Sequence, residues 1–136
     1  MDLDEVCKAL VATCADQSLW PDEMQGLTLY DVIPTSPEFP CLYPSWPSQL
    51  YEFSSRGSCN IDIALTVAVS RANELEAQPQ LRKIVSSGLI LEALYAAPRE
   101  QWIDLAFINI SNFRPEIFSD SMQALACDFN LSLRTK

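Results

Sequence analysis

The sequence contains no histidine, and this absence bears on most kinds of catalysis. Histidine is the commonest general base and metal ligand, and it activates the nucleophile in both Ser-His and Cys-His arrangements. Glycine is also scarce, and with Gly26, Gly57 and Gly88 as the only three, neither a phosphate-binding loop nor a dinucleotide fingerprint can be written. We therefore expect a protein that is not an enzyme and needs no cofactor and no metal ion.

Positive charge is in short supply as well. Nine Lys and Arg residues stand against 18 Asp and Glu, which gives a formal net charge of −9. Such a chain repels phosphates, and its basic residues form no cluster longer than the pair Arg82 and Lys83. Tight binding to nucleic acid is not expected.

Two further features that the sequence lacks bear on where in the cell the protein resides. No apolar run approaches the roughly 20 residues that a membrane-spanning helix needs, so we expect no membrane association. The five cysteines are an odd number, none forms a C-x-x-C pair, and Met1 leads directly into acidic residues. We expect reduced thiols in cytoplasm, with Cys7, Cys14, Cys59 and Cys127 as core residues.

What the chain does contain is enough apolar material for one folded domain, residues 1–136. Hydrophobic residues make up 49% of the sequence and charged residues 20%, a balance that is not typical of disorder. Apolar residues at helical spacing between Leu3 and Cys14 predict a helix over residues 2–16. The β-rich run 27–33 predicts a first strand.

Five prolines between Pro34 and Pro47 exclude a central strand there, so we expect only extended edge pieces at 40–43 and 49–53. Strict alternation from Cys59 to Ser70 predicts a long strand, one end of which would project beyond the sheet and be available to a partner.

The remaining segments predict two short helices and two strands. Residues 73–94 carry the helical spacing, with Pro79 in a first turn and Ser87 capping the second helix. The strands cover 102–110 and 121–133, with a bulge where the apolar phase shifts between Phe107 and Ile108. This order predicts an α+β fold, a mostly antiparallel sheet with helices packed on one face.

Four aromatic residues are candidates for contacts between subunits. They concentrate in the proline-rich stretch, where edge strands expose side chains, and exposed aromatics beside edge backbone are typical of interfaces. Covering the core is the equally open alternative. The candidates are Tyr43, Trp46, Tyr51 and Phe53.

A small-molecule site is a separate hypothesis. If the strands that carry Asp62 and Asp128 pair, the two carboxylates could come close enough to share a proton or bind a cation, but a solvated sheet face is the simpler account and the preferred one. Cys41 is a third residue that such a cleft would use.

The order of these elements resembles the tail terminator (tail completion) proteins of long-tailed bacteriophages over nearly the full length. The likeness rests on strands and turns, and the insertion Trp20-Pro21-Asp22 and the number of cysteines depart from the usual form. The segments that carry it are the helix from Met1-Asp2-Leu3-Asp4, Gly26-Leu27 through Pro34, Pro40-Cys41-Leu42-Tyr43-Pro44, Tyr51-Glu52-Phe53, Arg56-Gly57, the strand 61–69, Ser86-Ser87-Gly88, Ala93-Leu94 and Ala126-Cys127-Asp128-Phe129.

The resemblance implies a structural protein that forms a ring, commonly a hexamer. Such a ring caps the tail tube, ends its polymerisation and joins it to the head connector. Its partners are further copies of itself, the tail tube protein and the connector, and DNA passes through its lumen without tight binding. The expected location is the head-proximal end of the virion tail, after assembly in the host cytoplasm. The alternatives are a neck or head-completion protein of the same virion, and a small cytosolic ligand-binding domain.

Overall fold

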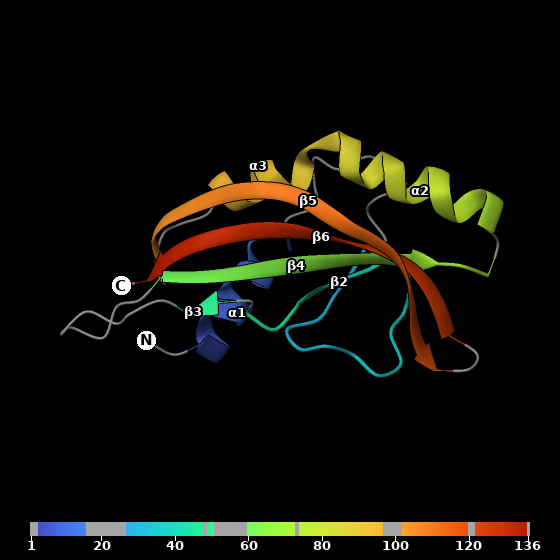
Figure 1. Ribbon diagram of the computed structural model, residues 1–136, viewed down its shortest axis with the longest axis horizontal. Coiled ribbons are helices and arrows are strands. Elements are labelled where there is room, and N and C mark those ends of the chain that lie inside the picture. The colour runs from blue at the N-terminus through green and yellow to red at the C-terminus, as the bar shows by residue number, and fades with distance from the viewer. Residues whose placement is uncertain are drawn as a thin grey trace.

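The computed structural model describes residues 3–15, 27–47, 49–50, 60–72, 74–96, 102–119 and 122–135. The elements within these ranges are, in chain order, α1 (Leu3–Ala12), β1 (Thr28–Leu29), β2 (Cys41–Pro44), β3 (Gln49–Leu50), β4 (Asn60–Ser70), α2 (Glu74–Ser87), α3 (Leu89–Ala96), β5 (Trp102–Ser119) and β6 (Met122–Thr135). This is the expected order, and the α+β class is confirmed (Figure 1).

The strands form one mostly antiparallel sheet in the order β1-β2-β4-β6-β5, with β3 pairing to β4 beside β2. Among the described strands, β1 and β2 are the one pair that runs parallel. The centre of the sheet is β4, which pairs with β6 over its whole length, from Asn60 opposite Arg134 to Ser70 opposite Ala124. The predicted projecting end of β4 is therefore wrong, because β6 and β3 accompany that end.

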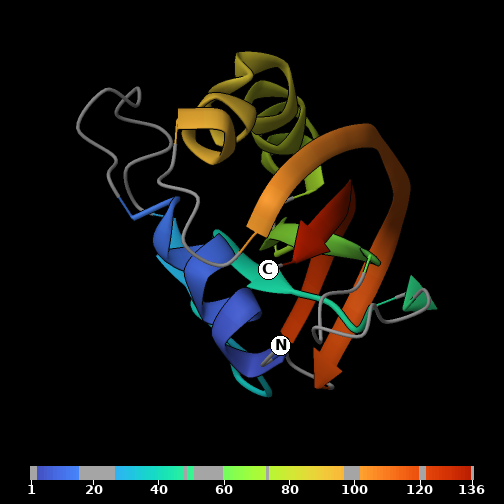
Figure 2. The ribbon, with the colours of Figure 1, turned by 90° about the vertical axis from the view of Figure 1, so that its left-hand side faces the viewer.

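All three described helices cover the same face of the sheet. Alternate residues of β4 and β6, such as Leu65 and Phe129, meet apolar side chains of α1, α2 and α3 in one core cluster, as the period-2 pattern predicted. Figure 2 shows α2 and α3 at the top of the view and α1, in blue, at the lower left. Among the residues described, no helix has both the length and the apolar character that crossing a membrane requires.

Several predicted boundaries differ from the structure. The run predicted as a strand over 27–33 is paired only at Thr28–Leu29. The strand β2 lies between β1 and β4, but β1 pairs only with Cys41 and Leu42. No described strand pairs with Pro44 on the side of β1, so the backbone N–H that proline lacks is not needed there. Pro79 lies inside α2, which begins at Glu74, and so it falls beyond the first turn in which it was predicted.

The hinge between α2 and α3 agrees with the prediction. Gly88 takes a left-handed φ of 72°, which a glycine adopts without strain. The hydroxyl of Ser87 accepts a hydrogen bond from the backbone N–H of Leu89 at 3.3 Å, so Ser87 caps the start of α3 as expected.

The strand β5 is longer than predicted, continuing from Ile110 to Ser119. Asn112 and Pro115 are poor strand residues, but β5 is an edge strand, where proline is tolerated and bulges are common. Its pairing with β6 shifts register at four places, and one of them is the predicted bulge at Ile108. Another, between Ser111 and Arg114, contains Asn112, whose φ is 58°.

Candidate functional site

The four aromatic candidates separate into different environments. Tyr43 is buried, with 3% of its surface exposed, whereas Trp46 is 80% exposed. Tyr51 and Phe53 lie outside the described residues. Of the two that can be placed, Tyr43 belongs to the core and only Trp46 is available to a partner.

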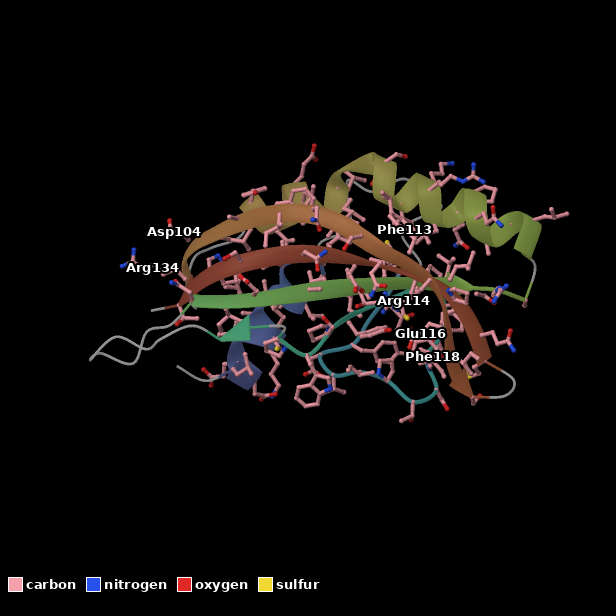
Figure 3. The ribbon with its side chains drawn as sticks, in the orientation of Figure 1. Asp104, Phe113, Arg114, Glu116, Phe118 and Arg134 are labelled. Carbon is pink, nitrogen blue, oxygen red and sulfur yellow. The ribbon has the colours of Figure 1, made fainter. Side chains whose placement is uncertain are left out.

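Tyr43 belongs to a second, smaller cluster on the face of the sheet that the helices leave uncovered. Its ring lies edge-on to Phe118, with centroids 6.0 Å apart, and Phe118 also contacts Phe39 at 5.8 Å. Burial, reinforced by the nearby charge of Glu116, raises the pKa of the Tyr43 hydroxyl. The curled end of the β5–β6 hairpin thus closes over small alanines of β4 and β6 (Figures 1 and 3).

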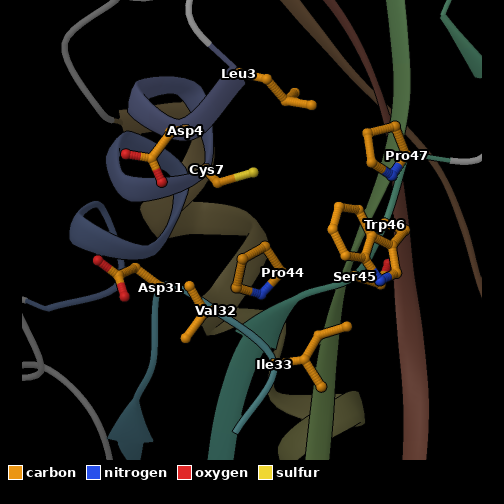
Figure 4. A pocket seen from close by; sticks show the side chains of 10 residues that line it. All are labelled: Leu3, Asp4, Cys7, Asp31, Val32, Ile33, Pro44, Ser45, Trp46 and Pro47. Atoms are coloured by element: carbon orange, nitrogen blue, oxygen red, sulfur yellow. The ribbon is translucent and has the colours of Figure 1, made fainter.

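Trp46 stands at the side of an open apolar groove between α1 and the segment after β2, seen in Figure 4. The groove has a volume of about 620 Å³. Its apolar walls come from both sides, and Val32 and Ile33 at its base are themselves 59% and 44% exposed. The lining residues are Leu3, Asp4, Cys7, Asp31, Val32, Ile33, Pro44, Ser45, Trp46 and Pro47.

The far rim of the groove is acidic. Asp4 and Asp31 both line it, with Asp4 bound to Lys8 at 2.9 Å. Burial raises the pKa of the Cys7 thiol, and the carboxylates of Asp4 and Asp31 raise it further. The Cys7 thiol is therefore not activated as a nucleophile.

Trp46 itself is held firmly. The preceding residue, Ser45, donates two hydrogen bonds to the carbonyl of Ala64 on β4, from its backbone N–H at 2.9 Å and from its hydroxyl at 3.1 Å. Pro44 and Pro47 flank the tryptophan and restrict the backbone on both sides. A large exposed ring is thus presented at low conformational entropy cost.

Further exposed apolar side chains lie at the opposite edge of the sheet, on β5. Ile108, Phe113 and Ile117 are 52%, 58% and 68% exposed. Sequence reasoning missed all three, because it ended the strand at Ile110 and bulges put residues out of the regular alternation. The signal that could have found them is the pair Asn112-Phe113, since asparagine is among the few residues that adopt a left-handed φ.

Phe113 borders a hollow between β5 and α2. This hollow has a volume of about 640 Å³ and is lined by Pro79, Arg82, Lys83, Val85, Ser86 and Phe113. Its lining combines apolar side chains with the two cations Arg82 and Lys83. Figure 3 shows Phe113 on the α2 side of β5, with Arg114, Glu116 and Phe118 on the other side.

The other side of β5 carries a polar network that fixes the bend of the hairpin. Asp128 accepts hydrogen bonds from the Thr66 hydroxyl at 2.7 Å, from Asn112 Nδ2 at 3.0 Å and from Arg114 Nη1 at 3.1 Å. Arg114 also donates to Glu116 at 2.8 Å. Burial alone would lower the pKa of Arg114, but these carboxylates outweigh it and raise the pKa.

The structure does not bring Asp62 and Asp128 together. Their strands pair, but Asp62 lies opposite Ser132 and Asp128 opposite Thr66. Four residues of strand correspond to roughly 13 Å, too far to share a proton or a cation. Cys41, the third residue of that hypothesis, is fully buried, and burial raises its pKa to about 12.

Within the described ranges, no three residues with metal-binding side chains gather into a cluster. No known family profile matches the chain, and no curated protein is similar enough to count as a relative. The site must therefore be interpreted from its own geometry, which is that of two apolar surfaces at opposite sheet edges.

Proposed function

We propose that this protein is a ring-forming virion assembly protein, a phage tail terminator that caps the tail tube and joins it to the head connector. The observation that carries the proposal is the placement of the two exposed apolar surfaces, around Trp46 at one sheet edge and Phe113 at the other. A closed ring needs two different patches on each subunit, so that each copy contacts the next head to tail.

The chemistry of the two surfaces supports this arrangement. The Trp46 groove has an acidic rim and the Phe113 hollow has a basic one, so unlike surfaces attract while two like surfaces repel. A symmetric dimer would put the same patch against itself and would set acid against acid or base against base. Head-to-tail contact is therefore favoured over a two-fold dimer.

The overall acidity agrees with a ring through which DNA moves. With −9 charges per subunit, a lumen that carries part of this excess repels phosphates and does not retain the DNA. The arrangement of a sheet with helices on one face, and its order of elements, is also what the resemblance to tail terminators implies.

The test is the mass of the protein in solution by light scattering, followed by negative-stain electron microscopy of the assembled fraction. Closed rings, about six subunits each, are the expected result. Purified rings should then bind the open ends of tail tubes from the phage that encodes the protein. Binding only to connector complexes would indicate the neck or head-completion alternative, and a monomer at all concentrations would exclude both.

A further inference from the structure

The contact between neighbouring copies can be specified further, on the assumption that the proposed ring is correct. We infer that Trp46 of one subunit inserts into the hollow between α2 and β5 of the next subunit, against Phe113, and that Arg82 of that hollow packs on the indole.

Trp46 and the hollow fit each other in shape. Trp46 projects from a segment that two prolines and the two hydrogen bonds of Ser45 hold in place, with 80% of its surface exposed. The hollow offers about 640 Å³, whereas a cavity of about 150 Å³ already accommodates benzene. An indole ring therefore fits with room for water at the rim.

The chemistry of the hollow suits an indole ring. Its lining combines apolar side chains with the cations Arg82 and Lys83, and tryptophan is the best partner in cation–π contacts. Arg82 already lies along α2, where its Nε donates to the carbonyl of Gln78 at 3.4 Å. Its planar guanidinium is thus beside the hollow before any partner arrives.

The charged residues of the groove and of the hollow are also of opposite sign. Insertion of Trp46 brings Asp31 and Asp4, the latter paired with Lys8, toward Arg82 and Lys83 of the hollow. Each subunit carries a net charge of −9, so copies repel at long range, and local opposite charges are needed to bring these surfaces into register. The inserting residue and its receiving hollow also lie at opposite sheet edges, as a closed ring requires.

The experiment uses two variants that each remove one half of the contact. Trp46→Ala removes the inserted ring, and Arg82→Glu reverses the rim of the hollow. We expect Trp46→Ala to raise the dissociation constant between subunits by about 30-fold or more, the range for a central tryptophan. Leu75→Ala and Arg134→Glu are matched controls, since both residues are exposed and neither lines the groove or the hollow. Circular dichroism checks that every variant folds.

Mixing the two variants gives the decisive result. Each variant alone should be monomeric where the wild type forms rings. An equimolar mixture should form dimers and nothing larger, because the Trp46 of the Arg82→Glu subunit meets the intact hollow of the Trp46→Ala subunit, and no second intact contact remains.

The possible failures are distinguishable. If the wild type forms rings and either variant assembles as well as its control, the ring stands and the inferred contact is wrong. If both variants are monomers but their mixture forms no dimers, the two surfaces are used in separate contacts, and the inference is again wrong. If the wild type stays a monomer up to about 100 μM, a hundred times a micromolar dissociation constant, both the ring and the contact are wrong.

Discussion

Arg114 and Asp128 form an ion pair across a bulge, with Arg114 Nη1 3.1 Å from Asp128 Oδ1. Ser111 is the residue directly opposite Asp128, and the extra residue at the Asn112 bulge lets Arg114 reach back toward it. The pair therefore links the bend of β5 to the centre of the sheet, because Asp128 also accepts a hydrogen bond from the hydroxyl of Thr66 on β4.

Replacing Asp128 by Asn should destabilise the fold by about 1–3 kcal/mol. The amide keeps the shape but removes the charge and one acceptor from a side chain that is 14% exposed, and it leaves Arg114 with only Glu116 as an anionic partner among the described residues. Urea unfolding measures the loss. Asp104→Asn, at an exposed position of the same hairpin, should change the stability by about 0.5 kcal/mol or less.

Leu65→Ala should lower the free energy of unfolding by about 2–5 kcal/mol. Leu65 is fully buried at the centre of β4, where it lies opposite Phe129, and the cavity left behind cannot collapse between two strands and the helices. Denaturant titration is the measurement. A loss below about 1 kcal/mol would show that the helix-covered face is not the main core.

The two aromatic candidates should respond in opposite ways to substitution by Ser. Tyr43→Ser removes a buried ring from its contact with Phe118 and should cost about 3 kcal/mol or more in unfolding free energy. Trp46→Ser should leave the stability of the monomer within about 0.5 kcal/mol, because the ring is exposed, and should reduce assembly. Thermal unfolding and light scattering on both variants separate the two effects.

Stability should fall at alkaline pH because buried thiols stay neutral in the fold. Burial raises the pKa of Cys41 and Cys127 from 9.0 to about 12, and that of Cys14 to about 11. Below pH 9 the thiols are neutral in both states, and the fold keeps its full stability. Between pH 9 and 12 they ionise in the unfolded state only, so the free energy of unfolding falls as the pH rises. Each thiol contributes a slope of up to about 1.4 kcal/mol per pH unit.

Urea unfolding between pH 7 and 10.5 measures this loss. Cys41→Ala removes one of the three thiols and should make the alkaline decline less steep, even though the variant is less stable at pH 7. An identical decline in wild type and variant would mean that Cys41 ionises as readily in the folded state as in the unfolded one.

Gly88→Ala should destabilise the protein by about 1–2 kcal/mol. A Cβ at this position meets nothing within 4 Å, so the cost comes from the left-handed backbone of the α2–α3 junction and not from a clash. Ser86→Ala, two residues earlier and exposed, is the control and should have little effect. Equal stabilities of Gly88→Ala and wild type would show that the junction takes another conformation.

The sequence predicted the elements best where one face of a regular element is buried. Alternation from Ile61 to Val69 identified β4 and its inward face, and the phase shift after Phe107 identified a bulge. Those signals are local, and burial enforces them. Strand order was not predictable, because it depends on which edges meet, and neither was the extension of β5 past Asn112, whose propensity argues against a strand.

The candidate site was predictable only in part. The proline-rich stretch correctly indicated exposed aromatics, since Trp46 is exposed, but Tyr43 three residues earlier is buried by Phe118 from the far end of another hairpin. Contacts of that kind join residues distant in sequence and leave no periodic trace. The hollow beside Phe113 likewise arises only when α2 and β5 are placed next to each other.

The bulges that interrupt the pairing of β5 also protect this edge of the sheet against aggregation. An exposed edge strand 18 residues long would be a template for uncontrolled strand addition and fibre growth. Its uninterrupted stretches of register are only Asp104–Phe107, Asn109–Ser111 and Arg114–Ile117, separated by bulges that twist the backbone. An incoming strand finds no straight ladder longer than four residues, so growth by backbone pairing is discouraged and aggregation through this edge is suppressed.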